Sequence, residues 1–269
     1  MIIKWIDVLP LKGQAQAFSV AQEAWAATNE CAGFNGQLGG WTAVQQGPSA
    51  SDSTSTNESA SANSRAMILA FWDDQPAIDG FMAHKHDAIA DNNHQAETYQ
   101  TCAVYYLQLE LALCAHDPLM PSKSESEHAL YTEFSETEIS HNALGHIGHI
   151  GHIGHIGFIR IADRTLKTDE PEWAEHAFLQ DQIHVWNPAM QACEGMLGGA
   201  VARFNKEKNR FLEISFWKNE QCHQQYCQGA FKAAKSQVKL GSYMDKLTDH
   251  HIHIEPKWHI EKVESEKRV

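Results

Sequence analysis

Apolar residues recur along the chain with the two periods that distinguish strands from helices. Short runs rich in β-branched and aromatic residues predict strands, and one of these contains Gly39 and Gly40, where glycine indicates a bulge or a close approach to the backbone. Between the runs, apolar residues three and four positions apart, such as Phe18, Ala21 and Trp25, predict helices that lay one face on a sheet. The strands are expected at 2–8, around 39–40, and at 65–72, 102–111, 158–162, 196–204, 211–217 and 250–260.

The same order of elements occurs twice, and two short motifs mark the repeat. The segment 36–40 (GQLGG) resembles 195–199 (GMLGG), which is an interval of 159 residues from Gly36 to Gly195. Phe71 and Trp72 are repeated as Phe216 and Trp217, an interval of 145. The difference between these two intervals lies in a loop. Between the two motifs, the first copy carries a Ser/Ala/Asn/Thr-rich stretch, and the second copy lacks this stretch.

Each copy predicts the order strand, helix, strand, strand, helix, strand, which places the chain in the α+β class. Such a ferredoxin-like βαββαβ module forms a four-stranded antiparallel sheet with both helices on one face, and its other face needs a partner. The second copy can supply it, so we expect two modules, 1–112 and 157–262, to form a pseudo-dimeric α+β barrel within one chain. Self-association stays open, although the barrel would be complete without it.

Charge and composition exclude some classes of function. The chain has 34 acidic against 21 basic residues, for a net charge of −13, so a nucleic-acid partner is not expected. No apolar run approaches the length that spans a bilayer, and residues 1–5 have no signal-peptide pattern. Six cysteines without a paired spacing are typical of free thiols. We therefore expect a cytoplasmic location and no membrane partner.

The expected linker, 113–156, is polar and ends in a Gly-His-Ile repeat over 145–157. In an extended conformation its histidines would line one side and could bind Zn²⁺ or Ni²⁺ weakly. A linker lengthened by copying of a short coding unit explains the repeat equally well. We favour that simpler explanation, and no metal site is assigned.

The first copy resembles a known family. The motifs that carry the resemblance are Ile3-Lys4-Trp5, Phe18 with Gln22 and Trp25, 36–41, Phe71-Trp72, Phe81-Met82, 86–89 and 95–99. They are similar to the bacterial YdbC-like family, which has no assigned function and belongs to the dimeric α+β barrel superfamily. That superfamily includes antibiotic-biosynthesis-type monooxygenases, haem-degrading oxygenases and stress-responsive proteins, so the fold constrains function poorly. The second copy resembles the family more weakly.

His86 and Asp87 are the best candidates for catalysis. They lie mid-helix in the copy that keeps the family pattern, and by the interval of 145 the second copy has Phe231 and Lys232 there. A neutral imidazole can accept a proton from an acidic substrate near pH 7. A histidine that only hydrogen-bonds across a helix–sheet interface would fit the same position. His84, Asp87 and Asp91 share one helical face, but an exposed polar face has the same spacing as a metal site.

Six further residues are candidates for ligand binding. Four aromatic side chains could line an apolar pocket, although aromatics at this spacing also form ordinary cores. Two glutamines lie within apolar stripes, so they need either hydrogen-bond partners or a ligand. The six residues are Gln22, Trp25, Gln37, Trp41, Trp72 and Tyr99.

Two classes of function remain open. The first is a barrel that binds a small molecule in the first copy, as a cofactor-independent monooxygenase or isomerase. The second is a non-catalytic stress-response or assembly protein whose barrel is filled by its own side chains. No cofactor is assigned. The chain lacks a P-loop, a dinucleotide-binding glycine motif, a nucleophile elbow and an HExxH motif, so phosphoryl transfer, nicotinamide chemistry, elbow-type serine hydrolysis and zincin proteolysis lose their simplest support. The Asn/Trp/His trio of haem-degrading relatives cannot be placed on this sequence either.

Overall fold

The computed structural model describes residues 1–42, 64–114 and 156–262. The first module consists of β1 (Ile2–Pro10), α1 (Ala15–Gln22), η1 (Glu23–Glu30), β2 (Phe34–Thr42), β3 (Ala66–Trp72), α2 (Gln75–Phe81), the π-helical turn η3 (Met82–His86), α3 (Asp87–Asn93), η4 (Gln95–Thr98) and β4 (Tyr99–Cys114). The second consists of β5 (Phe158–Leu166), α5 (Pro171–Asp181), the π-helical turn η6 (Gln182–Trp186), α6 (Asn187–Gln191), β6 (Met196–Phe204), β7 (Arg210–Trp217), α7 (Glu220–Gln228), α8 (Ala230–Lys235), α9 (Leu240–Tyr243), β8 (Met244–Ile254), η7 (Pro256–Trp258) and β9 (Ile260–Glu261).

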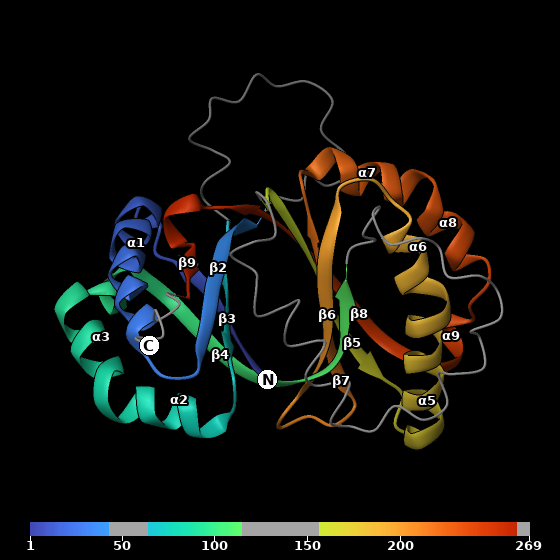
Figure 1. The fold of residues 1–269 in the computed structure, drawn as a ribbon, viewed down its shortest axis with the longest axis horizontal. Helices are drawn as coiled ribbons and strands as arrows, with labels where there is room; N and C mark the ends of the chain where they lie inside the picture. Colours follow the sequence, from blue (N-terminus) through green and yellow to red (C-terminus); the bar gives the residue numbers. More distant parts are fainter. Residues whose placement is uncertain (43–63, 115–155, 263–269) are drawn as a thin grey trace, which may run out of the picture.

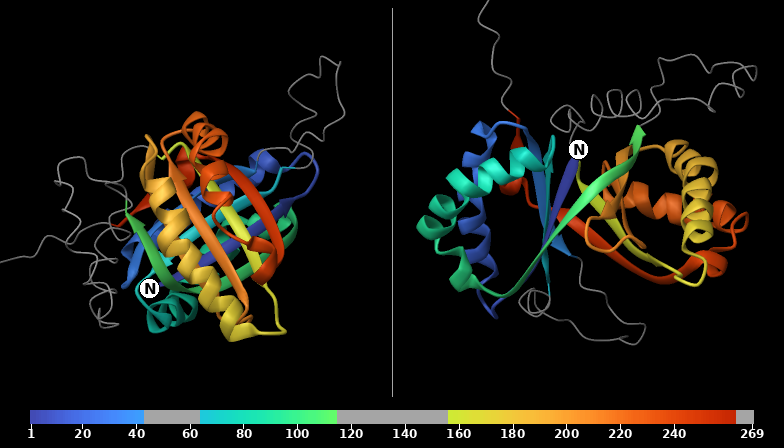
Figure 2. Two further views of the ribbon diagram at one scale, coloured as in Figure 1. Left: turned by 90° about the vertical axis from the view of Figure 1, so that its right-hand side faces the viewer. Right: turned by 90° about the horizontal axis from the view of Figure 1, so that it is seen from below.

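The strands form one closed antiparallel sheet. Their order is β2-β3-β1-β4 in the first module and β6-β7-β5-β8 in the second. The modules join where β4 pairs with β6 and β8 pairs with β2, so that β1–β8 close into a barrel. The helices of each module lie on the outside of its own sheet, at opposite ends of the molecule (Figures 1 and 2). The α+β class and the intrachain pseudo-dimeric barrel predicted from the repeat are confirmed.

Alternation along each strand separates two layers of core. On β1, Ile3 and Trp5 point into the barrel, whereas Ile2 and Val8 face the helices. The barrel interior is packed with side chains from both modules, among them Phe71, Phe204 and Phe216. The helix-facing layer of the second module is a single apolar cluster, but that of the first module is divided into two clusters.

Strand pairing corrects the interval predicted for the glycine motif. Gly36 lies opposite Phe71, and the residue opposite Phe216 is Gly198 rather than Gly195. Both glycines follow a bulge and have φ near +140°, a conformation that L side chains rarely adopt. The structural interval is therefore 162 residues, from Gly36 to Gly198, and the match at 159 was wrong by three residues. The interval of 145 for Phe71 and Phe216 agrees with the pairing.

The last predicted strand, 250–260, is also wrong in its limits. β8 begins earlier, at Met244, and ends at Ile254, because Pro256 cannot donate a ladder hydrogen bond and starts a 3₁₀ turn. The chain then crosses to the first module. There Trp258 is fully buried and donates to Ser19 Oγ at 3.1 Å, while β9 pairs with β2 (Figure 1).

The predictions about the linker, a membrane span and a metal site can be checked only within the described residues. β4 runs to Cys114, two residues past the expected end of the first module, and most of the Gly-His-Ile repeat lies outside the described residues. Within 1–42, 64–114 and 156–262, no helix is long and apolar enough to span a membrane. The same residues contain no group of three or more histidine, cysteine or acidic side chains placed to hold a metal ion.

A buried ionic network lies on the helix-facing side of the second sheet. Arg160 binds Glu213 at 3.0 Å and Asp249 at 2.5 Å, and Arg164 also donates to Glu213. Burial alone would raise the pKa of the Glu213 carboxyl, but the two guanidinium groups outweigh it and lower that pKa. The groups of this network are therefore charged and tightly held. Removal of one of them would leave the others as buried charges without a partner.

Replacing Glu213 with Gln should destabilise the protein by roughly 3–5 kcal/mol, because it leaves two guanidinium groups without a buried counter-charge. Urea unfolding followed by circular dichroism measures the change. The matched control is Glu207→Gln, where a partly exposed carboxylate pairs with Arg210 and the loss should be below about 1 kcal/mol. Equal losses in the two variants would contradict a structural role for the network.

Candidate functional site

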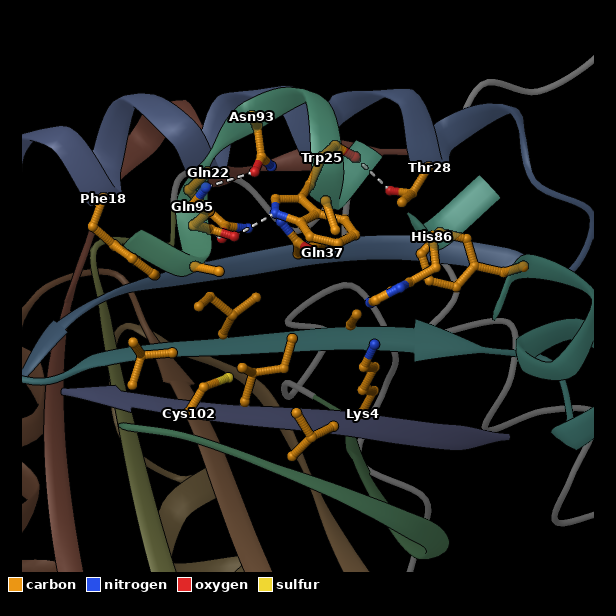
Figure 3. A pocket seen from close by; sticks show the side chains of 18 of the residues that line it. Lys4, Phe18, Gln22, Trp25, Thr28, Gln37, His86, Asn93, Gln95 and Cys102 are labelled. Carbon is orange, nitrogen blue, oxygen red and sulfur yellow. Dashed lines mark hydrogen bonds between the residues drawn. The ribbon is translucent and has the colours of Figure 1, made fainter. Parts of the chain in front are cut away.

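A cavity of about 150 Å³ lies between the sheet and the helices of the first module. It separates the two helix-facing clusters of that module, and its walls are mainly apolar and aromatic (Figure 3). The polar side chains that line it are Lys4, Gln22, Thr28, Gln37, His86, Asn93, Gln95, Tyr99 and Cys102.

Lys4 is the unusual member of this set. β1 presents Lys4 to the cavity because alternate residues of the strand face the helices, and the side chain is 6% exposed. Among the described residues its ammonium group has no hydrogen-bond or ion-pair partner, and its closest compensation is the faces of Phe81 and Tyr106, at 5.6 and 6.0 Å. Burial lowers the pKa of Lys4 to about 8.

The equivalent position in the second module shows what Lys4 lacks. β1 and β5 pair with β3 and β7 in the same way, so Lys4 corresponds to Arg160. The two carboxylates that bind Arg160 come from Glu213 and Asp249. The pairing places Ile68 and Val104 at their positions in the first module. The first module therefore keeps a buried cation at a place where both anions have been replaced by apolar side chains.

His86 reaches the cavity from the opposite wall. Its ring packs against Trp25 at 5.4 Å and Phe81 at 5.7 Å, and its Nδ1 is 2.8 Å from Oδ1 of Asp87. That hydrogen bond orients the imidazole and leaves Nε2 for the cavity. Figure 3 shows Lys4 and His86 pointing toward one another, one from the sheet and one from the helical turn. A cation and an imidazole placed in this way can bind an acidic group and transfer its proton.

The second module has a phenylalanine in place of His86. Phe231 packs against Trp186 at 5.4 Å and Tyr226 at 5.8 Å, which repeats the contacts of His86 with Trp25 and Phe81. This packing agrees with the interval of 145 that places Phe231 at the position of His86. An imidazole at this position is thus found in the first module and not the second, while the aromatic packing around the position is common to both.

A chain of hydrogen bonds fixes the wall opposite the sheet. The indole Nε1 of Trp25 donates to Oε1 of Gln95 at 2.8 Å, and Nε2 of Gln95 donates to Oε1 of Gln22 at 2.8 Å (Figure 3). On β2, Gln37 donates to the carbonyl oxygen of Trp258 at 3.2 Å. The glutamines therefore satisfy both alternatives that the sequence left open, since they have hydrogen-bond partners and also line a cavity.

The structure brings together most of the residues singled out from the sequence, but not all. Trp41 is outside the cavity and packs against Trp258 at 5.1 Å and Phe18 at 6.0 Å in a core cluster. Asp87 is 85% exposed and touches the site only through His86. The predicted residues that line the cavity are Gln22, Trp25, Gln37, Trp72, Tyr99 and His86.

Five polar lining residues were missed, namely Lys4, Thr28, Asn93, Gln95 and Cys102. The signal for Lys4 was present, because a lysine in the apolar run 2–8 falls on the same face as Ile2, Ile6 and Val8. A charge within such a stripe needs either a partner or a function. No comparable pattern marks Gln95 or Cys102, whose positions depend on how η4 and β4 pack.

These features define the class of protein: an α+β barrel of two fused modules, one of which has a cavity containing a lysine and a histidine. The family described as "Domain of unknown function (DUF4937)" matches residues 2–52 and 56–107, both within the first module. "Uncharacterized protein YdbC" of Bacillus subtilis (strain 168) is 31% identical over 95 residues, which cover 35% of this chain and 67% of that protein. Through its first module, the chain belongs to this YdbC-like family.

Solved structures support the barrel over nearly the whole chain. A protein of Fusobacterium nucleatum described as a "Putative monooxygenase" has a TM-score of 0.60 at 9% identity, over 94% of this chain and 91% of that one. A protein of Lactobacillus acidophilus with the same description has a TM-score of 0.57 at 12% identity, over 97% and 96%. At these identities the likeness establishes the fold alone.

Replacing Lys4 with Met should stabilise the protein by up to about 3 kcal/mol near pH 7, since folding no longer buries an unpaired ammonium group. The folded pKa, about 8, lies below the ordinary 10.5, so the cost is complete below pH 8 and disappears as the pH rises toward 10.5. Urea unfolding across that pH range measures the difference between variant and wild type.

The matched control is Arg160→Met at the equivalent position of the second module. It removes the partner of Glu213 and Asp249, so it should destabilise by roughly 3–5 kcal/mol. If Lys4→Met and Arg160→Met destabilise alike, Lys4 has a counter-charge and the site has been misjudged.

Proposed function

We propose that the first module binds a small, mostly apolar molecule with one acidic oxygen and catalyses proton transfer on it. The acidic oxygen, from a carboxylate, phenol or enol, lies on the Lys4 ammonium group, and Nε2 of His86 accepts or returns the proton. The observation that carries the proposal is the burial of Lys4 with no anion among the described residues, in a cavity that is also lined by His86, whose position is occupied by Phe231 in the second module. An external anion would supply the counter-charge that the described residues do not.

The size and lining of the cavity favour a ligand of about one ring. In an engineered protein, an apolar cavity of about 150 Å³ binds benzene. The cavity of the first module has a similar volume, and Trp25, Trp72 and Phe81 provide aromatic walls. A single ring can pack against these walls while its acidic substituent reaches Lys4.

The arrangement supports an isomerase that needs no cofactor. His86 can take a proton from carbon next to a carbonyl or enol group, with its orientation held by Asp87. Lys4 lies where negative charge develops on the oxygen, and its ammonium group would be effective because the cavity is apolar. Return of the proton to another carbon or to oxygen completes an isomerisation.

Cofactor-independent monooxygenation is the second candidate. The same steps would give an enolate or phenolate that can react with O₂, in which an activated CH₂ becomes C=O and the second oxygen atom leaves as water. Fold analogy with the two proteins described as "Putative monooxygenase" favours it. The non-catalytic alternative rests on the packed barrel interior, and it does not account for a separate cavity in which Lys4 has no carboxylate partner among the described residues.

Benzoate is a suitable probe of the anion site, because it combines one ring with one carboxylate. Below pH 8, wild-type protein should bind it, Lys4→Arg should retain most of the affinity, and Lys4→Met should lose at least about tenfold. Isothermal titration calorimetry measures the affinity, with Lys85→Met, a change at a half-exposed lysine, as the control. Equal affinity for benzoate in wild type and Lys4→Met would rule out the proposed anion site.

Proton transfer can be measured separately as exchange of the α-hydrogens of cyclohexanone in deuterated buffer, followed by proton NMR. His86→Phe copies the side chain found at Phe231, so the variant should fold, yet lose about 10²-fold or more of the catalysed exchange. His84→Phe, on the exposed side of the same turn, should leave the rate unchanged. No difference between the two variants would remove His86 as the proton acceptor.

A further inference from the structure

We infer that Lys4 forms a reversible imine with a small aldehyde or ketone held in the cavity of the first module. This inference rests on the proposed function, because both use the same cavity, and it goes further by naming carbonyl compounds as the substrate class. The chain would then use the amine of Lys4 as a nucleophile as well as a charge.

The surroundings of Lys4 are those of a reactive amine. The side chain is almost fully buried, projects from β1 into an apolar cavity, and has no carboxylate to hold it as an ammonium ion in the described part of the chain (Figure 3). In the second module the equivalent residue is Arg160, whose guanidinium group does not form imines and is bound by two carboxylates. Only the first module therefore keeps a lysine at this position.

The groups that face Lys4 leave its amine partly neutral. Cys102 and Tyr106 on β4 have pKa values raised by burial, so neither supplies an anion near pH 7, and His86 faces it from η3. With a pKa of about 8, about one Lys4 in ten carries a neutral amine at pH 7, against about one in three thousand for a lysine with the ordinary pKa. The neutral amine is the form that attacks a carbonyl.

The reaction balances with groups already in the cavity. The lone pair of the Lys4 nitrogen forms a bond to the carbonyl carbon, the C=O π pair moves to oxygen, and a proton passes from nitrogen to that oxygen. His86 can carry this proton, and a second proton lets the oxygen leave as water, which gives a protonated imine. Its positive charge draws electrons from the α-carbon, so His86 can then remove the α-proton and form an enamine.

Reductive trapping tests the imine on the full chain. Wild-type protein is incubated near pH 7 with benzaldehyde and sodium cyanoborohydride, which reduces a protonated imine to a stable benzylamine. We expect one benzyl group per chain, located on Lys4 by fragment-ion sequencing that separates Lys4 from the amino terminus. Labelling of Lys4 should be at least about tenfold faster than that of Lys85, and benzoate should slow it without protecting Lys85.

The variants separate this inference from the proposed function. Lys4→Arg keeps the positive charge and should still bind benzoate, but it should lose the fast labelling, as should Lys4→Met. If Lys4 reacts no faster than Lys85 in protein that binds benzoate, the imine is wrong and the anion site stands. If Lys4 reacts slowly and benzoate does not bind either, both proposals fail.

Discussion

The structure depends on two strand pairings between the modules, β4 with β6 and β8 with β2. A four-stranded sheet with helices on one face leaves its other face bare, and these pairings close the two bare faces into one barrel. The large side chains inside, such as Trp5, Phe71 and Phe216, then belong to a core that neither module could form alone. The cavity described above lies outside that interior, in the helix-facing layer of the first module.

The two helix-facing layers have the same framework and different contents. In the second module, Arg160 and Glu213 lie in an ionic network, and Phe231 fills the place of an imidazole. In the first, Lys4 is buried in a cavity that His86 also lines, with no anion bound to it in the part of the chain that the structure describes. Burial of Lys4 carries a desolvation cost that is offset locally by the faces of Phe81 and Tyr106 alone among the described residues. The two modules thus share the barrel core, and the candidate site lies in the first.

The candidate site was predictable where it depended on local pattern. Gln22 and Gln37 stood out as polar residues in apolar stripes, and both line the cavity. Trp41 stood out as an aromatic in the family motif but packs against Trp258, which arrives from the far end of the chain. Lys4 was not predicted as a site residue, because a single lysine in a strand does not reveal whether a carboxylate lies near it in the sheet. The side chains at the neighbouring sheet positions come from residues more than 60 positions away, such as Ile68.

The sequence by itself determined the order of strands and helices, the duplication and the barrel class, because periodicity and repeated motifs are local properties of the chain. Only the tertiary structure decided the alignment of Gly36 with Gly198. The two copies match almost equally well in sequence at two offsets that differ by three residues, whereas hydrogen bonding between the strands allows only one register. The tertiary structure also decided that residues 256–261 cover the first module and that, within the described ranges, Lys4 has no ion-pair partner. These outcomes depend on contacts between segments that are far apart in the sequence. Such buried contacts determine which charges are paired and what shape a site has.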